Sequence, residues 1–185
     1  MATTFPGTTI ETCSLKKGSS KQMFDGIFAA GGITLSQVSI LSGLEYYLIQ
    51  NWVKRGFVSS PVKRVYSREQ FARIIIINML RDTLPIEKIS SLIHIIGGDP
   101  NDRSDDLIGD DELYHRYVDL AAEAGGKVIT DPEAILAAVE RSASSYDEPI
   151  PGARKRLIKI LQVMAFAHFA SVSRRAAEEI LSKLD

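Results

Sequence analysis

The chain has little of what a disulfide-linked, membrane-spanning or secreted protein needs. A single cysteine, Cys13, among 185 residues allows no disulfide within one chain, and such a chain suits the cytosol, where we expect it to be found. The longest apolar runs, 74–77 and 164–167, are far shorter than the roughly 20 residues of a membrane helix. The first seven residues lack the basic and apolar regions of a secretory signal.

Motifs for catalysis or metal binding are also missing. We find no glycine-rich phosphate loop after a strand and no nucleophile elbow. His94, His115 and His168 are far apart in the sequence and have no partner at ligand spacing, which argues against a zinc site. The aspartates between 99 and 111 do not fit a calcium loop, because Arg103 and Ser104 occupy the positions of a ligand and of the glycine. We therefore expect no enzyme, no metal and no cofactor.

The composition that is present is that of an ordinary globular protein. Hydrophobic residues make up 45% and charged residues 24% of the chain, close to globular averages. Residues 1–20 are rich in Thr, Ser and Gly and lack apolar periodicity, so we expect a mobile tail there. The Gly-Gly-Asp-Pro sequence at 97–100 is the clearest boundary. We expect a domain at 21–98 and a helical region at 99–185 that serves dimerisation or signal input.

Apolar residues at helical spacing predict an all-α protein with one small β-hairpin. Thr34 is a predicted helix cap, and Ser67 with Gln70 forms a predicted capping box. Val38 and Ile40 are expected on the buried side of the helix that Thr34 begins. Helices are predicted at 23–28, 34–43, 45–55, 67–84, 85–96, 110–124, 132–144 and 153–184, and a hairpin with a Ser-Ser-Pro turn at 57–66.

The helix at 45–55 has two different faces. One carries an apolar stripe made of Leu48, Ile49, Trp52 and Val53, which favours a core position for Trp52. The other carries Tyr47, Gln50, Asn51 and Lys54 at positions i, i+3, i+4 and i+7. This second face has no core to fill, and its amides and lysine are groups that read base edges and phosphates. The helices at 34–43 and 45–55 therefore predict a helix-turn-helix, with the hairpin as its wing.

Charge is unevenly distributed along the chain. Residues 43–81 hold seven basic and two acidic side chains, a net +5, whereas residues 99–123 hold nine acidic and two basic ones, a net −7. Lys63 and Arg64 lie in the predicted wing, where the phosphates of bound DNA would lie. The acidic stretch is expected to be a solvated face.

Residues 33–96 resemble the DNA-binding domain of MerR-type transcription regulators. The resemblance rests on 34–43, on WVKRGFV at 52–58, on YSREQF at 66–71 and on LPIEKI at 84–89. IQNWVK at 49–54 and PVKRVYS at 61–67 are similar to an uncharacterised bacterial MerR-like family filed as a domain of unknown function. The resemblance implies a winged helix-turn-helix regulator that binds duplex DNA as a homodimer. The candidate DNA contacts are Tyr46, Tyr47, Gln50, Asn51, Lys54, Arg55, Lys63, Arg64 and Tyr66.

Two alternatives stay open at this point. MerR proteins carry an arginine and a tyrosine where this chain has Gln50 and Asn51, and their wing is longer. These departures, with a net charge of −1, suit a protein-interaction or ligand-sensing module that does not bind DNA. The last helix at 153–184 either packs on the preceding helices or forms the subunit interface, and an unknown small-molecule effector is a further candidate partner.

Overall fold

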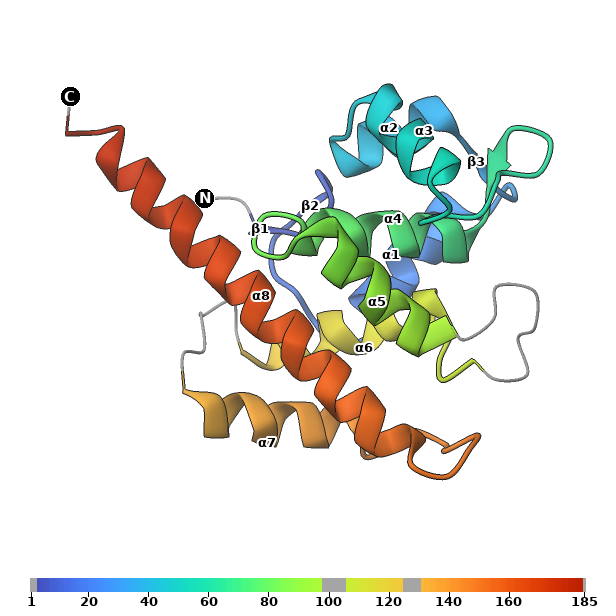
Figure 1. Cartoon of the computed structure of the whole chain (residues 1–185). Coiled ribbons are helices and arrows are strands. Elements are labelled where there is room, and N and C mark those ends of the chain that lie inside the picture. Colours follow the sequence, from blue (N-terminus) through green and yellow to red (C-terminus); the bar gives the residue numbers. More distant parts are fainter. Residues whose placement is uncertain (1–2, 98–105, 125–130, 185) are drawn as a thin grey trace.

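The computed structural model describes residues 3–97, 106–124 and 131–184, and these are mostly helical (Figure 1). Their eight α-helices are α1 (Ser19–Ile27), α2 (Leu35–Ser42), α3 (Tyr46–Lys54), α4 (Arg68–Leu80), α5 (Ile86–Gly97), α6 (Asp110–Glu123), α7 (Pro132–Ala143) and α8 (Ala153–Leu181). Four two-residue strands form two antiparallel pairs, β1 (Thr3–Thr4) with β2 (Glu11–Thr12) and β3 (Ile33–Thr34) with β4 (Val65–Tyr66). The predicted all-α class is confirmed at this level.

Side-chain caps fix where α2 and α4 begin. The Thr34 hydroxyl accepts a hydrogen bond from the Gln37 backbone N–H (3.4 Å), and the Gln37 side chain accepts one from the Thr34 N–H (2.8 Å). Ser67 and Gln70 make the same two bonds at 3.2 and 2.8 Å. Both arrangements are capping boxes, which satisfy N–H groups that have no partner inside a helix. The helix starts predicted at Thr34 and Ser67 are therefore confirmed.

Helix α4 lies at the centre of the molecule and is buried on nearly every side. Eight of its 13 residues are buried, because α2, α6 and α8 all pack against it. The Phe71 ring of α4 lies 5.6 Å from that of Phe24 in α1, which in turn lies 5.7 Å from the Tyr114 ring of α6. One continuous hydrophobic core thus joins the two regions that the sequence predicted as separate. The predicted boundary at 97–100 lies almost entirely outside the described residues.

Residues 3–18, here called the N-terminal strap, are ordered against the helices. Phe5 is buried with 6% of its surface exposed. The Tyr114 hydroxyl donates a hydrogen bond to the Pro6 carbonyl (2.8 Å), and the Asn78 side-chain amide donates one to the Gly7 carbonyl (2.9 Å). The expectation of a mobile tail at 1–20 is therefore wrong for residues 3–20. The strap is held by groups that follow about 70 to 110 positions later in the chain, and local periodicity does not reveal them.

The wing, residues 57–66, also differs from the predicted hairpin. Strand β4 pairs with β3, the short strand before α2, and not with residues 57–58. Val62 and Val65 pair with each other across a two-residue turn, and the Val65 N–H donates to the Val62 carbonyl at 2.9 Å. Lys63 and Arg64 are the central residues of this turn. The turn predicted at Ser-Ser-Pro is thus wrong, because the side-chain amide of Gln70 holds the two serine carbonyls at 3.0 Å against the start of α4.

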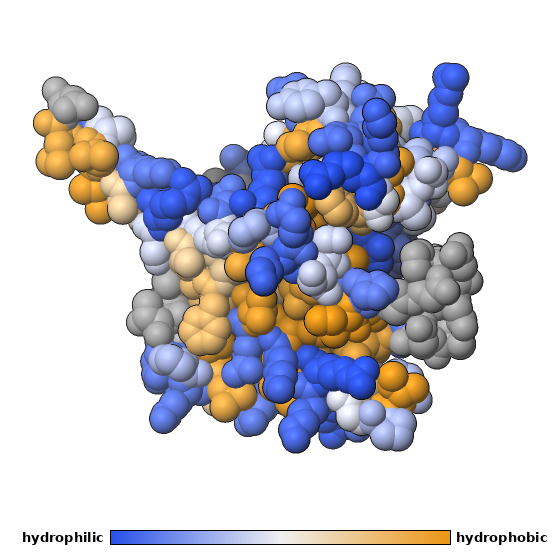
Figure 2. Space-filling view, viewed as in Figure 1, coloured by the Kyte–Doolittle hydropathy of each residue, from blue (hydrophilic) through white to orange (hydrophobic). Residues whose placement is uncertain are grey.

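Helix α8 is the longest and runs along the outside of the bundle. It packs against α7 along much of its length and also contacts α4 and α6, whereas its C-terminal end projects beyond the body (Figure 1). Apolar side chains cover this projecting end (Figure 2), where Ile180, Leu181 and Leu184 are 64, 65 and 75% exposed. No helix within the described ranges has the length and apolar character needed to cross a membrane.

Candidate nucleic-acid interface

Helix α3 presents the two faces that its sequence predicts. Ile49 and Trp52 are 0% and 4% exposed and belong to the core, so the core position expected for Trp52 is confirmed. Leu48 and Val53 are half-buried beside them. The face that carries Tyr47, Gln50, Asn51 and Lys54 is exposed along its whole length.

The exposed face of α3 is free to contact a ligand. Tyr47 is 70% exposed, and within the described residues neither Gln50 nor Asn51 has a side-chain hydrogen bond. The helix begins at Glu45, which makes no capping bond with its side chain. A turn centred on Gly43, with φ of +70°, sets α3 against α2, and the two helices pack closely. The structure thus has two short helices in succession around a tight turn, with α3 as the second.

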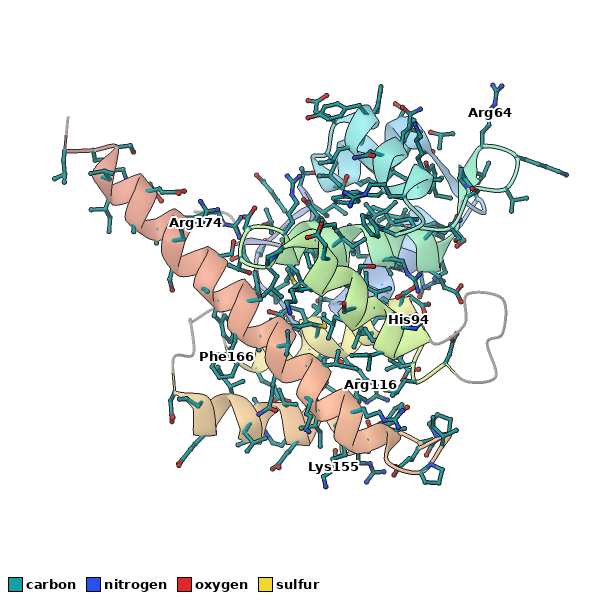
Figure 3. The ribbon with its side chains drawn as sticks, in the orientation of Figure 1. Arg64, His94, Arg116, Lys155, Phe166 and Arg174 are labelled. Atoms are coloured by element: carbon teal, nitrogen blue, oxygen red, sulfur yellow. The ribbon has the colours of Figure 1, made fainter. Side chains whose placement is uncertain are left out.

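The tip of the wing is a basic turn in an unusual backbone conformation. Lys63 and Arg64 have φ angles of +51° and +65°, a region that side chains other than glycine, asparagine and aspartate rarely adopt. Two successive residues of this kind, closed by the bond from Val65 to Val62, form the tight hairpin turn that normally carries Asn-Gly. Both side chains are exposed, and Arg64 points away from the body of the molecule (Figure 3). Two cationic residues therefore occupy the turn positions that Asn and Gly would adopt with less strain, and their side chains project into solvent.

Three of the seven basic side chains of 43–81 have an acidic partner, and one of these is Arg55, which lies 3.7 Å from Glu87. Arg68 binds Asp25 at 2.8 Å, and Arg73 binds Asp110 at 2.8 Å. These two arginines therefore serve the fold. In the part of the chain that the structure describes, no acidic side chain lies within ion-pair distance of the others, which are Lys54, Lys63, Arg64 and Arg81.

Three of the unpaired cations lie at one end of the molecule. Helix α3, which ends at Lys54, and the wing occupy the same end (Figure 1). Val53 of α3 and Val62 of the wing line a common cleft, so the end of the helix and the wing are neighbours. Arg81 follows the far end of α4 and does not belong to this group.

Three of the predicted contact residues have other roles in the fold. Tyr66 is only 3% exposed, because its position on β4 turns the side chain into the core while Val65 faces outward. Burial also raises the pKa of its phenol, and Tyr66 is removed from the set of surface contacts. Arg55 lies over the Phe57 ring at 4.6 Å from its centroid and 3.7 Å from the Glu87 carboxylate. Tyr46 is 49% exposed and donates a hydrogen bond of 3.3 Å to Ser36, so it joins the start of α3 to the start of α2.

The exposure of two apolar side chains, Val62 and Ile40, was not predicted from the sequence. Val62 is 74% exposed next to the basic turn, and it was missed because the turn was expected three residues earlier. Ile40 of α2, expected in the core, is 67% exposed. Only Val38 and Ser42 of this eight-residue helix are buried, since α2 touches the core along a single narrow edge. A branched side chain at a groove is suited to contact with a thymine methyl or a sugar.

Described acidic side chains lie both beside this surface and away from it. Glu87 lies 3.7 Å from Arg55, and Glu69 lines the same cleft as Val53 and Val62. Helix α6 packs on the side of α4 opposite to α2 and α3 (Figure 1). Its Asp110 is buried, which raises the pKa of the carboxyl, although the neighbouring Arg73 opposes this shift. The first part of the acidic stretch, residues 99–105, falls outside the described ranges. Within these ranges no cluster of three potential metal ligands occurs.

Comparison with known proteins gives one match. Residues 34–117 match the model of a family described as a domain of unknown function, DUF1836. The match begins at the capping residue of α2 and ends within α6, so it includes helices on both sides of the predicted boundary. No curated protein matches the chain significantly. No solved structure matches it significantly.

Proposed function

We propose that this protein is a sequence-specific, DNA-binding transcriptional regulator with a MerR-like winged helix-turn-helix. The observation that supports it best is the exposed polar face of α3, where Gln50, Asn51 and Lys54 have no partner within the described residues. The opposite face of the same helix is buried, so α3 is rigidly held and these side chains are displayed on a fixed frame. The unpaired cations of the neighbouring wing supply the positive charge that binding to a phosphate backbone requires.

In this proposal α3 enters the major groove. The amides of Gln50 and Asn51 have the two-pronged geometry that pairs with adenine, and Lys54 meets guanine or a phosphate. Each good contact of this kind discriminates against a wrong base by about 1–3 kcal/mol. Tyr47 contacts a phosphate or a thymine methyl. The proposed function needs no catalytic group and no cofactor.

The wing binds the backbone beside the groove. Lys63 and Arg64 meet phosphates there, as the wings of winged helices do, and set the position of α3 without reading sequence. Arg55 joins them when its pair with Glu87 opens. Such exposed ion pairs contribute only about 0–1 kcal/mol, and the side chains of this pair are 46% and 72% exposed.

We further propose that the protein binds DNA as a homodimer. One recognition helix covers one half of a palindromic site, and two-fold symmetry presents a second helix to the other half. The projecting end of α8 supports this, because its exposed Ile180, Leu181 and Leu184 offer apolar surface with no partner within the described residues. Replacing Ile180 and Leu184 with serine should lower the molar mass measured by light scattering to that of a monomer, whereas Val163→Ser, on the packed part of α8, should not.

Selection of binding sites from random duplex DNA tests the central claim. Enrichment of a palindrome by the unmodified protein, and loss of its base preference in a Gln50→Ala, Asn51→Ala variant, would support it. A matched control is Gln22→Ala with Ser173→Ala, two exposed polar side chains on α1 and α8, which should leave the selected sequence unchanged. Absence of retained DNA at low salt would refute the proposal.

A second candidate function is a protein-interaction or ligand-sensing module that does not bind DNA. It is favoured by the overall charge of −1 and by the pairing of Arg55 with Glu87, which withdraws one cation from the interface. The same selection experiment separates the two functions, because the module would enrich no sequence.

A further inference from the structure

A second cleft, far from the wing, lies between α8, the N-terminal strap and the end of α4. Its volume is about 580 Å³, within the range of clefts that hold small molecules. Its apolar lining includes Leu15 of the strap, Met79 of α4 and Phe169 of α8. Its polar groups include two arginines, Arg81 and Arg175. The sequence analysis gave no indication of it, because the lining residues come from five separate segments of the chain.

The two arginines that line this cleft are not neutralised by its two carboxylates. Its two carboxylates already have cationic partners, since Asp82 pairs with Arg174 at 3.4 Å and Glu179 with Lys183 at 2.7 Å. Arg174 lies where α8 passes the loop after α4 (Figure 3). Neither Arg81 nor Arg175, by contrast, has an acidic partner within the described residues. The cleft therefore keeps two guanidinium groups available for an anion.

His168 adds a neutral hydrogen-bond donor to the same cleft. Its Nδ1 lies 2.5 Å from the hydroxyl of Tyr117, a side chain that is fully buried. That hydroxyl has no other acceptor within the described residues, so it donates its proton to Nδ1, and the imidazole proton is then on Nε2. His168 itself is one of the residues that line the cleft. Burial, and the charge of nearby Arg175, lower the pKa of His168 to about 4.

We infer that this cleft binds a small organic carboxylate with an apolar body. Arginine pairs with the planar carboxylate through two parallel hydrogen bonds, and Arg81 and Arg175 supply such groups. The Nε2–H of His168 donates a further bond to the carboxylate. The apolar side chains of the cleft contact the apolar body of the ligand. A ligand that carries charge along its whole length would not bind there.

The cleft also touches the helix-turn-helix. Ser42, the last residue of α2, lines it, and the Asn78 amide donates hydrogen bonds of 2.9 Å to the carbonyls of both Ser42 and Gly7 of the strap. Thr9 of the strap in turn donates to the Ile40 carbonyl at 2.7 Å. An occupant therefore lies against the groups that hold the end of α2. Its role as an effector of DNA binding rests on the proposed function, whereas the site itself does not.

Titration of the full chain with hexanoate, followed by amide chemical shifts, tests the site without DNA. We expect saturable shifts in the strap and around His168, no binding of hexanamide, and weaker binding of inorganic phosphate. Arg81→Gln and Arg175→Gln should each weaken hexanoate binding by about tenfold or more, as loss of a charged hydrogen bond does. Arg156→Gln is the control, because Arg156 is an exposed arginine of the same helix outside the cleft.

Several results would overturn the inference. Equal binding of hexanoate and hexanamide would show that the carboxylate is not recognised. Equal affinity for phosphate and hexanoate would show that the apolar lining contributes nothing, and unchanged affinity in both arginine variants with intact amide spectra would place the anion elsewhere. A protein that binds hexanoate but no DNA would refute the proposed function and leave the site standing. A protein that binds both, with DNA affinity unchanged by hexanoate, would refute the effector role.

Discussion

The basic turn of the wing permits a substitution that should move stability and DNA affinity in opposite directions. Lys63 and Arg64 have φ angles of +51° and +65°, a conformation that costs an ordinary side chain about 1 kcal/mol. Asparagine tolerates this conformation and glycine adopts it freely. The double change Lys63→Asn and Arg64→Gly should therefore raise the free energy of unfolding by about 1 kcal/mol, after part of the gain is offset by the greater freedom of glycine in the unfolded chain.

The same change should weaken DNA binding in a salt-dependent way. Two phosphate contacts per protomer are four per dimer, so the slope of log affinity against log salt should become shallower by about 3.6. Between about 50 and about 200 mM salt, the unmodified protein should then lose about 100-fold more affinity than the variant. Fluorescence anisotropy with a labelled duplex gives the slope, and chemical denaturation gives the stability.

The opposite signs exclude misfolding as the cause of weaker binding. Lys155→Gln with Arg156→Gln is a control of equal charge, because both side chains are exposed near the start of α8, where Lys155 lies far from the wing (Figure 3). An unchanged slope in the wing variant, or an equal change in the control, would refute the placement of phosphates at the wing. A less stable wing variant would refute the reasoning about the turn.

Three further predictions concern α3, the strap and His168. Gln50→Ala and Asn51→Ala should each reduce discrimination at one base pair by about 1–3 kcal/mol, measured by competition between single-base variants of the selected site, with the midpoint of denaturation unchanged. Gly7→Ala should destabilise the fold by about 1–3 kcal/mol, because the added Cβ would lie 2.1 Å from the Ile75 carbonyl oxygen; equal denaturation curves would contradict this. The pKa of His168 in the folded state is lowered to about 4, so between about pH 6.5 and 4 the unfolded chain binds a proton that the folded chain does not, and stability falls on acidification. His168→Gln should remove about 2 kcal/mol of the loss between pH 7 and pH 5, and an identical loss in both proteins would refute it.

Features that depend on contacts between residues close together in the sequence could be predicted from it. The capping boxes at Thr34 and Ser67 involve residues three positions apart, and the core position of Trp52 follows from the spacing of its own helix. The polar face of α3 was predictable for the same reason. In each case the interacting groups lie within one or two helical turns, where spacing alone determines which side chains share a face.

Features that depend on contacts between residues far apart in the sequence could not be predicted from it. Strand β4 pairs with residues more than 30 positions earlier, so neither the true turn of the wing nor the burial of Tyr66 follows from the local sequence. The strap depends on hydrogen bonds from Asn78 and Tyr114, which follow it by about 70 to 110 positions in the chain. The second cleft has the same origin, because helices and the strap meet there from opposite ends of the chain.

The burial of α4 on nearly every side limits how far the proposed DNA-binding unit can be moved into another protein. Its apolar side chains pack against α6 and α8 as well as against α2. A fusion that carries only residues 33–96 would lack both α6 and α8. Such a graft would expose an isoleucine-rich surface and precipitate. Reporter or chimeric designs built on this chain therefore need α8 as much as α3.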